Sequence, residues 1–317
     1  MPDDPLISVL ILTYNQRQFI AQAVDSVLAQ KTGFNYEIVI SDDHSTDGTA
    51  DILLEYQKRY PVKFKININN ENVGALRNAF EIAVPLCRGK YLAFLEGDDY
   101  WNDESKLERQ IRFLEENGEF GLVHSDVNQF YEAKQSLIEN YNAINGITIP
   151  EGHIYNELLD PEKYIIKTPS VILIKELIEK YFDFSVIREM NWVLSDLFLW
   201  LSIARFTKVK YFPEAMATYR VLRESSSNTE DFQRKLKLHK SVYEIRLFFI
   251  EKYGCPEKLE EKVQRFYMTA MAFDAIKLKD KNLLEWVKNY SKKNNIHIGI
   301  KNTALLLKIK LLNCFLK

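Results

Sequence analysis

Over its first 124 residues the chain alternates short apolar runs with amphipathic segments, and this alternation restricts the fold more than any other feature. Strand-like apolar runs occur at 7–12, 36–40, 63–68, 91–95 and 120–124. Between them apolar residues recur at helical spacing, as they do near 75–86 and 105–116. Strand–helix–strand units of this kind join parallel strands through right-handed crossovers. The pattern therefore predicts an open α/β sheet covered by helices, with the cleanly alternating run 63–68 at an edge.

The second half of the chain is less regular. A strand is expected over 171–174 and a helix over 192–205, whereas the polar stretch 125–164 predicts loops and short strands. After Thr229 the pattern is helical, with helices predicted over 232–253 and 257–278. A polar linker near 224–230 precedes them. We therefore expect a catalytic domain over 1–225 and a C-terminal helical region over 226–317.

The composition excludes several classes of protein. The 317 residues are 46% hydrophobic and 13% aromatic, which is ordinary for a globular protein with a substantial core. The formal net charge of −2 implies no global attraction to nucleic acid. No run of about 18 apolar residues occurs, and the acidic N-terminus has no signal-peptide pattern. Three widely spaced cysteines fit reduced thiols, so we expect a cytoplasmic protein.

Acidic side chains follow two neighbouring strands of the predicted sheet. Asp42 and Asp43 come after the second strand, and Glu96, Asp98 and Asp99 come after the fourth. In an open α/β sheet, ligands bind at the carboxyl ends of the strands. Several carboxylates at one edge would repel one another unless a cation compensates them, and oxygen ligands suit Mg²⁺ or Mn²⁺ together with a diphosphate. Acidic residues at strand ends can also serve only as turn and helix caps, the simpler interpretation for Thr46 and Asp47.

Motifs that the sequence lacks narrow the choice further. No G-x-G-x-x-G follows the first strand and no G-x-x-x-x-G-K-[ST] occurs, which argues against dinucleotide enzymes and P-loop NTPases. No serine stands in a G-x-S-x-G setting. The five histidines are scattered without metal-ligand spacing.

Five ordered motifs between about residues 6 and 222 resemble those of the family 2 glycosyltransferases, which have a GT-A fold. The first two are the opening strand through Asn15 and the segment 37–48, Glu-Ile-Val-Ile-Ser-Asp-Asp-His-Ser-Thr-Asp-Gly. Asn72-Val-Gly-Ala-Leu-Arg-Asn78 is similar to the family's N-x-G-x-x-x-R-N segment. Glu96-Gly-Asp-Asp-Tyr-Trp101 stands in place of its D-x-D region. Segments 195–201 and 212–220 resemble the region that holds the catalytic base.

The resemblance implies a role for each matching residue. The nucleotide pocket would be formed by Thr13, Tyr14, Asn15, Asp42, Asp43, Arg77 and Asp98. Within it, Asp43 or Asp42 would read the uracil edge. Asp99 would coordinate Mn²⁺ or Mg²⁺, with Asp98 and Glu96 beside it. Asp196 would be the general base that deprotonates an acceptor hydroxyl for in-line attack on the anomeric carbon, with inversion.

Three positions depart from the family pattern. Glu96 replaces the first aspartate of the D-x-D region, Ser195 replaces an acid before the base, and Leu222 replaces a histidine after Tyr-Arg. Arg220 and Arg223 are candidates to replace the lost phosphate contact. Trp101 and Trp192 are candidates for stacking on a sugar and lining an acceptor site, although tryptophans are more often core residues.

After Glu285 the chain has seven lysines and no acid, interleaved with apolar residues. This segment is typical either of an amphipathic helix on an anionic membrane or of a helix packed on protein, including a second copy. The resulting expectation is an inverting glycosyltransferase that uses a UDP-sugar and a glycan or lipid-linked acceptor, at the cytoplasmic face of a membrane or in the cytoplasm. The alternatives are a nucleotidyltransferase, whose glycine-rich loop is missing, and a non-catalytic GT-A-like module.

Overall fold

The computed structural model describes residues 4–163, 166–193, 196–223 and 231–296. The chain forms two compact units, neither continuous in sequence. Unit 1 comprises Met1–Ile154, Ile166–Phe184 and Ser202–Arg220. Unit 2 comprises Tyr155–Ile165, Ser185–Leu201 and Val221–Lys317. The predicted linker at 224–230 and the part of the lysine-rich segment after residue 296 lie outside the described residues.

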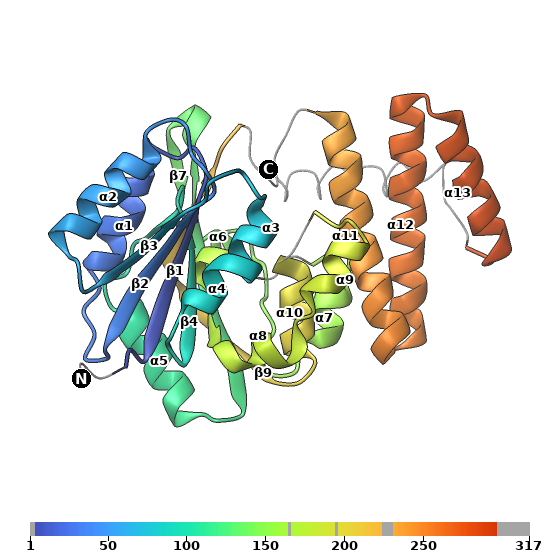
Figure 1. The fold of residues 1–317 in the computed structure, drawn as a ribbon. Helices are drawn as coiled ribbons and strands as arrows, with labels where there is room; N and C mark the ends of the chain where they lie inside the picture. The colour runs from blue at the N-terminus through green and yellow to red at the C-terminus, as the bar shows by residue number, and fades with distance from the viewer. Residues whose placement is uncertain (1–3, 164–165, 194–195, 224–230, 297–317) are drawn as a thin grey trace. The chain divides into compact units, whose positions relative to one another are not determined.

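Four parallel strands form one half of the sheet of unit 1 (Figure 1). They are β1 (Ile7–Thr13), β2 (Tyr36–Asp42), β3 (Phe64–Ile68) and β4 (Tyr91–Glu96). β1 lies between β2 and β4, while β3 pairs only with β2. The apolar runs at the start of the chain therefore predict these strands correctly, including the edge position of β3.

The other half of the sheet is antiparallel. β8 (Ile172–Ile174) lies between β4 and β6 (Phe120–Tyr131), and β9 (Lys208–Val221) lies between β6 and β5 (Tyr100–Trp101). β7 (Ser136–Ile138) pairs with β6. The described part of the chain thus has a nine-stranded mixed sheet in the order β3-β2-β1-β4-β8-β6-β9-β5, with β7 beside β6. This confirms the expected mixed α/β fold.

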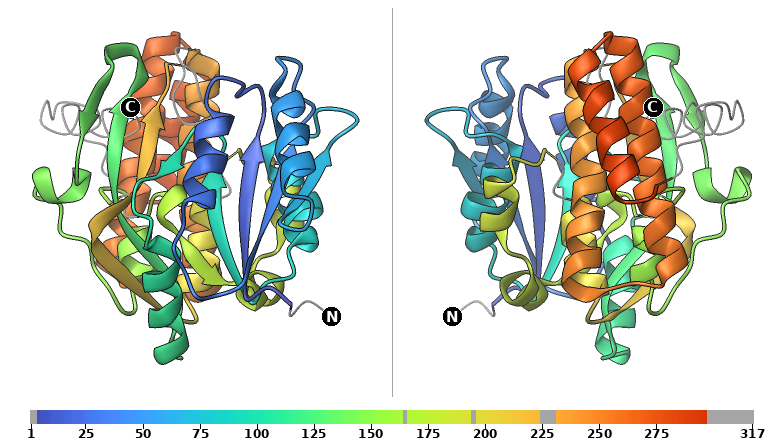
Figure 2. Two further views of the ribbon diagram at one scale, coloured as in Figure 1. Left: turned by 90° about the vertical axis from the view of Figure 1, so that its left-hand side faces the viewer. Right: turned by 90° about the vertical axis from the view of Figure 1, so that its right-hand side faces the viewer.

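Helices cover both faces of the sheet (Figures 1 and 2). α1 (Ile20–Leu28), α2 (Thr49–Arg59) and α5 (Lys106–Glu116) contribute their apolar residues to one core cluster with the side chains of β1, β2, β4 and β6. The opposite face carries α3 (Ala75–Arg77) and α4 (Val84–Leu86), which a π-helical turn over Asn78–Ala83 joins. Shorter helices are α6 (Tyr141–Ile144) and α8 (Lys175–Tyr181). Each large aliphatic side chain buried between these layers contributes about 1.5–3 kcal/mol to folding.

Unit 2 is helical in its described residues. It contains α7 (Tyr155–Leu159), α11 (Phe232–Tyr253), α12 (Glu257–Leu278), α13 (Lys281–Lys293) and the larger parts of α9 (Phe184–Glu189) and α10 (Asp196–Ala204). The Asp231 carboxylate caps α11, and Gly254 (φ 73°) ends it. α11 and α12 have the predicted bounds. No described helix combines the length and apolarity that crossing a bilayer requires.

Candidate active site

The carboxyl ends of β1, β2 and β4 meet at one edge of unit 1. Thr13 is opposite Asp42, and Leu12 is opposite Glu96, because the strands are parallel and in register. The next residues continue the pairing: the Asp43 N–H donates to the Thr13 carbonyl (2.9 Å), and the Gly97 N–H donates to the Leu12 carbonyl (2.8 Å). The polar residues predicted from three separate motifs therefore lie along one edge.

The loops after β1 and β2 are tied to each other. Asn15, in the left-handed region (φ 52°), donates its N–H to Ser45 Oγ (2.8 Å), and its side-chain oxygen accepts the Thr46 N–H (2.9 Å). The Asp47 carboxylate accepts the Arg17 N–H (2.9 Å) and the Thr49 N–H (3.0 Å). Asp47 thus caps the start of α2 and joins the two loops.

Tyr14 has 49% of its surface exposed beside these joined loops. Its ring is therefore available to a ligand at the sheet edge. The sequence predicts Thr13, Tyr14 and Asn15 as lining of a nucleotide pocket; Thr13 is buried, whereas Tyr14 and Asn15 are exposed.

Asp42 and Asp43 are both buried, and each holds a turn. Asp42 accepts the N–H (2.8 Å) and the hydroxyl (2.5 Å) of Ser45. Asp43 accepts the N–H groups of Val73 (2.8 Å) and Gly74 (2.9 Å), so it anchors the loop that precedes Arg77. Gly74 has φ 86°, a conformation that favours glycine. Arg77, at the end of that loop, pairs with Glu81 (3.1 Å) and is more than half exposed.

A network of buried side-chain amides supports the loop that Asp43 anchors. The Asn69 amide donates to Asp43 (2.9 Å) and to the side-chain oxygen of Asn78 (3.0 Å). Asn78 in turn donates to the Ser41 carbonyl (3.1 Å) and accepts the Ser41 hydroxyl (2.6 Å). Sequence reasoning quoted Asn78 within a motif without giving it a role and missed Asn69, because only the fold brings residues 41, 69 and 78 together.

Asp98 and Asp99 form the most electrostatically unfavourable part of the edge. Burial, followed by the charges of Asp98 and Glu96, holds the pKa of Asp99 well above its usual value. Burial also raises the pKa of Asp98, against the opposing effects of Arg220 and the Gln16 amide. A cation placed among these carboxylates would reverse both shifts. The arrangement therefore suits a positively charged ligand.

The carboxylates fit a divalent cation that takes the rest of its ligands from a substrate. Asp98, Asp99 and Glu96 offer only oxygen donors, which Mg²⁺ and Mn²⁺ prefer. Within the described ranges, no three His, Cys, Asp or Glu side chains make a complete metal site. Mg²⁺ is commonly held by one or two carboxylates together with substrate phosphates. The Asp98–Asp99 turn matches that mode better than a closed protein cage.

Two buried oxygens beside this turn have no hydrogen-bond partner among the described residues. They are Thr13 Oγ1 and Gln16 Oε1. Both border Gly97: a Cβ atom at that position would lie 2.4 Å from Gln16 Oε1 and 2.8 Å from Thr13 Oγ1. Unsatisfied buried polar atoms are rare and often mark a place where a ligand binds. Sequence reasoning missed Gln16, whose only signal is its place in the loop after the first strand.

A comparison with known protein families now identifies the chain. The model of glycosyl transferase family 2 matches residues 8–188, more than half of the sequence. The chain belongs to glycosyl transferase family 2. This confirms the resemblance seen in the motifs at the ends of β1, β2 and β4.

Proteins with similar sequences are consistent with membership of this family. The uncharacterized protein Rv1520 of Mycobacterium tuberculosis is 33% identical over 216 residues, which cover 68% of this chain and 58% of that protein. The Escherichia coli protein WfgD, named a UDP-Glc:alpha-D-GlcNAc-diphosphoundecaprenol beta-1,3-glucosyltransferase, is 29% identical over 64% of this chain and 71% of its own length. The aligned region thus spans little more than half of the first relative.

Two solved structures share the fold at low sequence identity. S. aureus TarS in complex with UDP-GlcNAc has a TM-score of 0.57, with 17% identity over 87% of this chain and 76% of that one. The mannosyltransferase PcManGT of Pyrobaculum calidifontis, in complex with GDP-Man and Mn²⁺, has a TM-score of 0.60, with 15% identity over 98% and 81%. These likenesses confirm the GT-A fold of the family 2 chain.

The predicted base of this family 2 chain, Asp196, belongs to unit 2, whereas the strand-end carboxylates belong to unit 1. It is the first residue of α10, is half-buried, and accepts the N–H of Leu197 (2.7 Å). Its neighbour Ser195 falls outside the described residues. The role of Asp196 therefore stays a prediction.

The two predicted aromatic contacts of this family 2 chain are core residues. Trp101 is 4% exposed, and its indole N–H donates to the Pro169 carbonyl (2.9 Å). Trp192 is 3% exposed and donates to Glu244 (3.0 Å) within unit 2. Neither ring presents a face on which a sugar could stack. The structure thus favours the packing interpretation for both.

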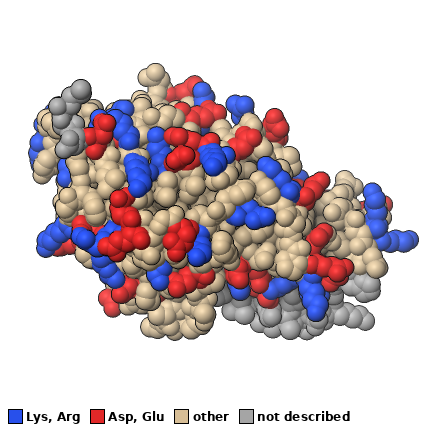
Figure 3. Space-filling view, turned by 90° about the horizontal axis from the view of Figure 1, so that it is seen from below, with Lys and Arg blue, Asp and Glu red and all other residues tan. Residues whose placement is uncertain are grey.

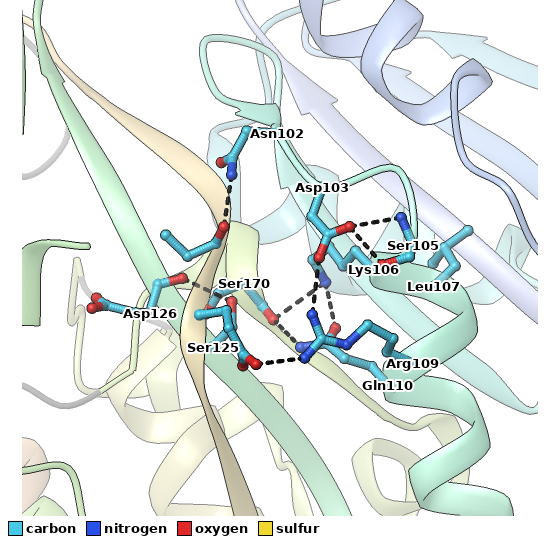
Figure 4. Close-up of polar contacts among 12 residues, drawn as sticks. Asn102, Asp103, Ser105, Lys106, Leu107, Arg109, Gln110, Ser125, Asp126 and Ser170 are labelled. Carbon is cyan, nitrogen blue, oxygen red and sulfur yellow. Dashed lines mark hydrogen bonds and ion pairs between the residues drawn. The ribbon is translucent and has the colours of Figure 1, made fainter. Parts of the chain in front are cut away.

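The segment after Asp99 is fixed by the polar contacts in Figure 4. The Asn102 amide donates to the Ala215 carbonyl of β9 (2.7 Å), and Arg109 pairs with Asp103 (3.2 Å). The Lys106 ammonium contacts Gln110 (2.6 Å) and the Ser170 carbonyl (3.2 Å).

Basic and acidic side chains are interspersed on the face drawn in Figure 3, which shows no extended patch of one sign.

Proposed function

We propose that the protein is a metal-dependent, inverting glycosyltransferase that moves a sugar from a UDP-sugar to a hydroxyl of a glycan or lipid-linked acceptor. The observation that supports this most is the pair of neighbouring carboxylates at the sheet edge, the half-buried Asp98 and the buried Asp99, both with raised pKa. Family membership supports sugar transfer over nucleotidyl transfer. The nucleotide-sugars named for TarS and PcManGT, and the lipid diphosphate acceptor named for WfgD, support the donor and acceptor classes.

The proposal gives each residue of the site a specific role. Tyr14, Asp43 and Arg77 bind the nucleotide, and Asp98 and Asp99 hold Mn²⁺ or Mg²⁺. When bound, the cation neutralises charge on the leaving diphosphate. Asp196 accepts the proton of the acceptor hydroxyl as its oxygen attacks the anomeric carbon from the side opposite the diphosphate. A single displacement of this kind inverts that carbon.

A lipid-linked acceptor would place the reaction at the cytoplasmic face of a membrane, where we propose that the protein works. The lysine-rich segment after Glu285 would then contact the membrane or a second copy of the chain. Sedimentation with anionic and neutral vesicles, beside the oligomeric state measured without them, separates these two uses. Binding only to anionic vesicles would support the first.

Titration calorimetry with UDP, GDP and CMP, first with Mn²⁺ and then with chelator, tests the nucleotide and metal sites. We expect UDP to bind in a metal-dependent way and Asp99→Asn to weaken that binding. Asp51→Asn, an exposed change on α2, is the matched control. Failure of every nucleotide to bind the folded protein would contradict the proposal.

Sugar transfer tests the base. Asp196→Asn should abolish turnover and leave UDP binding intact, because the side chain keeps its size and loses its basicity. Unchanged turnover would refute the assignment of Asp196. Nucleotide binding without turnover in the unaltered protein, over a panel of donors and acceptors, would instead indicate a non-catalytic module.

A further inference from the structure

Arg220 of β9 is a buried cation at the candidate site. Its side chain is 7% exposed, and each of its three guanidinium nitrogens donates a hydrogen bond within unit 1. Nε donates to the Asp98 carbonyl (2.7 Å), Nη1 to Glu132 Oε2 (2.5 Å) and Nη2 to Gln22 Oε1 (2.7 Å). The guanidinium therefore connects three chain segments that are far apart in sequence: the Asp98–Asp99 turn, the short turn that follows β6, and α1.

The backbone of Arg220 acts on the same turn. Its N–H donates to Asp99 Oδ1 (2.7 Å), where β9 runs antiparallel to β5. One residue thus holds the main chain of Asp98 and the carboxylate of Asp99. Three aromatic rings surround the guanidinium at 4.5–5.6 Å, namely Phe19, Phe130 and Tyr100. Contacts of this kind restrict the guanidinium to one place.

These contacts conflict with the expectation that Arg220 binds a phosphate. A phosphate contact would compete with bonds already made by all three nitrogens, one of them to the charged Glu132. It would also leave the Glu132 carboxylate, which is about one-third exposed, without its cation. Arginine forms charge-assisted bonds of the same kind with phosphate and with carboxylate, so the exchange would gain no stronger contact and would leave Glu132 unpaired.

We propose that Arg220 is a positioning residue, which sets the Asp98–Asp99 turn for metal and diphosphate binding and is itself fixed by Glu132 and Gln22. The inference rests on the proposed function, because it concerns the same site. If Arg220 has this positioning role, Glu132 and Gln22 affect metal affinity through Arg220. They would not do so if Arg220 bound a phosphate. Their effects should depend on Arg220 being present.

The test is a titration of Mn²⁺ into protein saturated with UDP, followed by electron paramagnetic resonance of the free ion. Arg220→Lys keeps the positive charge but loses the planar guanidinium that bonds to three partners at once. Glu132→Gln keeps the size of the side chain and loses its charge. Removing a residue that orients metal ligands typically costs 10–100-fold in metal affinity, so we expect a loss of about tenfold in each variant. Arg112→Ala, which removes an exposed arginine of α5 paired with Glu108, is the matched control and should change nothing.

The sign of the Glu132→Gln effect decides between the two roles. If Arg220 bound phosphate, releasing it from Glu132 would leave Mn²⁺ and UDP binding unchanged or tighten it, and either result would overturn the inference. The double variant Arg220→Lys/Glu132→Gln should be no weaker than the worse single variant, and additive losses would also overturn it. If circular dichroism shows that Arg220→Lys does not fold, the same Mn²⁺ titration of Glu132→Gln and Gln22→Ala tests the inference.

Failure of the inference is distinguishable from failure of the proposed function. If the unaltered protein binds no nucleotide with Mn²⁺, the proposed function fails. If it binds UDP with Mn²⁺ and Glu132→Gln binds equally well, only the positioning role fails. Uridine, which has no phosphate, is titrated as a second ligand for comparison. Its affinity should not change in any of the variants, because the proposed function assigns the turn that Arg220 fixes to the metal and the diphosphate.

Discussion

Lys106 begins α5 with its ammonium group inside unit 1, which makes the stability of this unit depend on pH. The side chain is fully buried and reaches two neutral acceptors, Gln110 Oε1 and the Ser170 carbonyl (Figure 4), with the Trp101 ring 4.8 Å away. Burial lowers the pKa of Lys106 from 10.5 to about 7, and Asp103 opposes this only weakly. A neutral amine can still donate to both acceptors, so the native contacts survive deprotonation.

The sign and size of the effect follow from this shift. Between pH 7 and 10.5 the unfolded chain keeps the proton that the folded protein has released, so stability rises with pH in that window. One pKa unit corresponds to about 1.4 kcal/mol, so the ammonium costs about 4–5 kcal/mol at pH 7. Between pH 7 and 8.5 the free energy of unfolding should therefore increase by about 2 kcal/mol because of Lys106 alone.

Lys106→Met isolates this contribution, because methionine fills the space without a charge. The free energy of unfolding of unit 1 can be measured by urea-dependent hydrogen exchange of β1 and β4 amides at several values between pH 6.5 and 8.5. We expect the difference between the unaltered protein and Lys106→Met to change by about 2 kcal/mol from pH 7 to 8.5. Lys58→Met, an exposed change on α2, should give no such difference. Parallel profiles for the unaltered protein and Lys106→Met would refute the reasoning.

Three further substitutions test the packing around the site. Gly89→Ala would place a Cβ atom 2.4 Å from a backbone nitrogen of β1 and should destabilise unit 1 by about 3 kcal/mol in urea unfolding, whereas Gly118→Ala, which meets nothing within 4 Å, should change stability by less than about 0.5 kcal/mol. Gly97→Ala should displace the two unpartnered oxygens beside it and weaken UDP binding in calorimetry on the order of tenfold, the loss expected from one or two polar contacts, with Gly33→Ala as the neutral control. Asp43→Ala should expose the amides of the loop before Arg77, which hydrogen exchange would detect as lost protection; full protection would show that the loop holds itself.

The parallel half of the sheet is predictable because burial on both faces produces continuous apolar runs. β1, β2 and β4 sit at the centre of this half, and their positions follow from such runs. α11 and α12 are predictable for another reason, since Gly254 and Pro256 interrupt a long helical pattern. In both cases the signal is local, so one stretch of sequence is enough to identify the element.

β9 shows where local signals fail. Its 14 residues include exposed polar positions and a proline, Pro213, so they lack both the apolar run and the strict alternation that identify strands. Its place in the sheet depends on β5 and β6, which are more than 75 residues away in sequence. The sequence pattern does not predict it. The burial of Trp101 and Trp192 was not predicted for the same reason, because only tertiary packing decides whether an indole is buried.

The candidate site shows that residue type and residue role are separate questions. Motif positions predicted which carboxylates would gather at the sheet edge, and Asp42, Asp43, Asp98 and Asp99 do lie along it. Their surroundings distinguish them in a way that spacing could not. Asp42 and Asp43 accept bonds from loop N–H groups, and Asp99 accepts the Arg220 N–H, but Asp98 and Asp99 have pKa values raised by burial, that of Asp99 also by neighbouring carboxylates.

That contrast assigns the two pairs different tasks. A carboxylate satisfied by N–H groups gains little from a cation, so Asp42 and Asp43 suit the nucleotide side of the site, where they also hold its loops in place. A buried carboxylate beside another carboxylate is held at a cost in free energy that a bound cation would relieve. The site is therefore expected to be stiff on the side of β2 and responsive to metal on the side of β4. Chelation should accordingly change hydrogen exchange around the Asp98–Asp99 turn and leave the amides that Asp43 binds unaffected, and equal changes at both places would contradict this division.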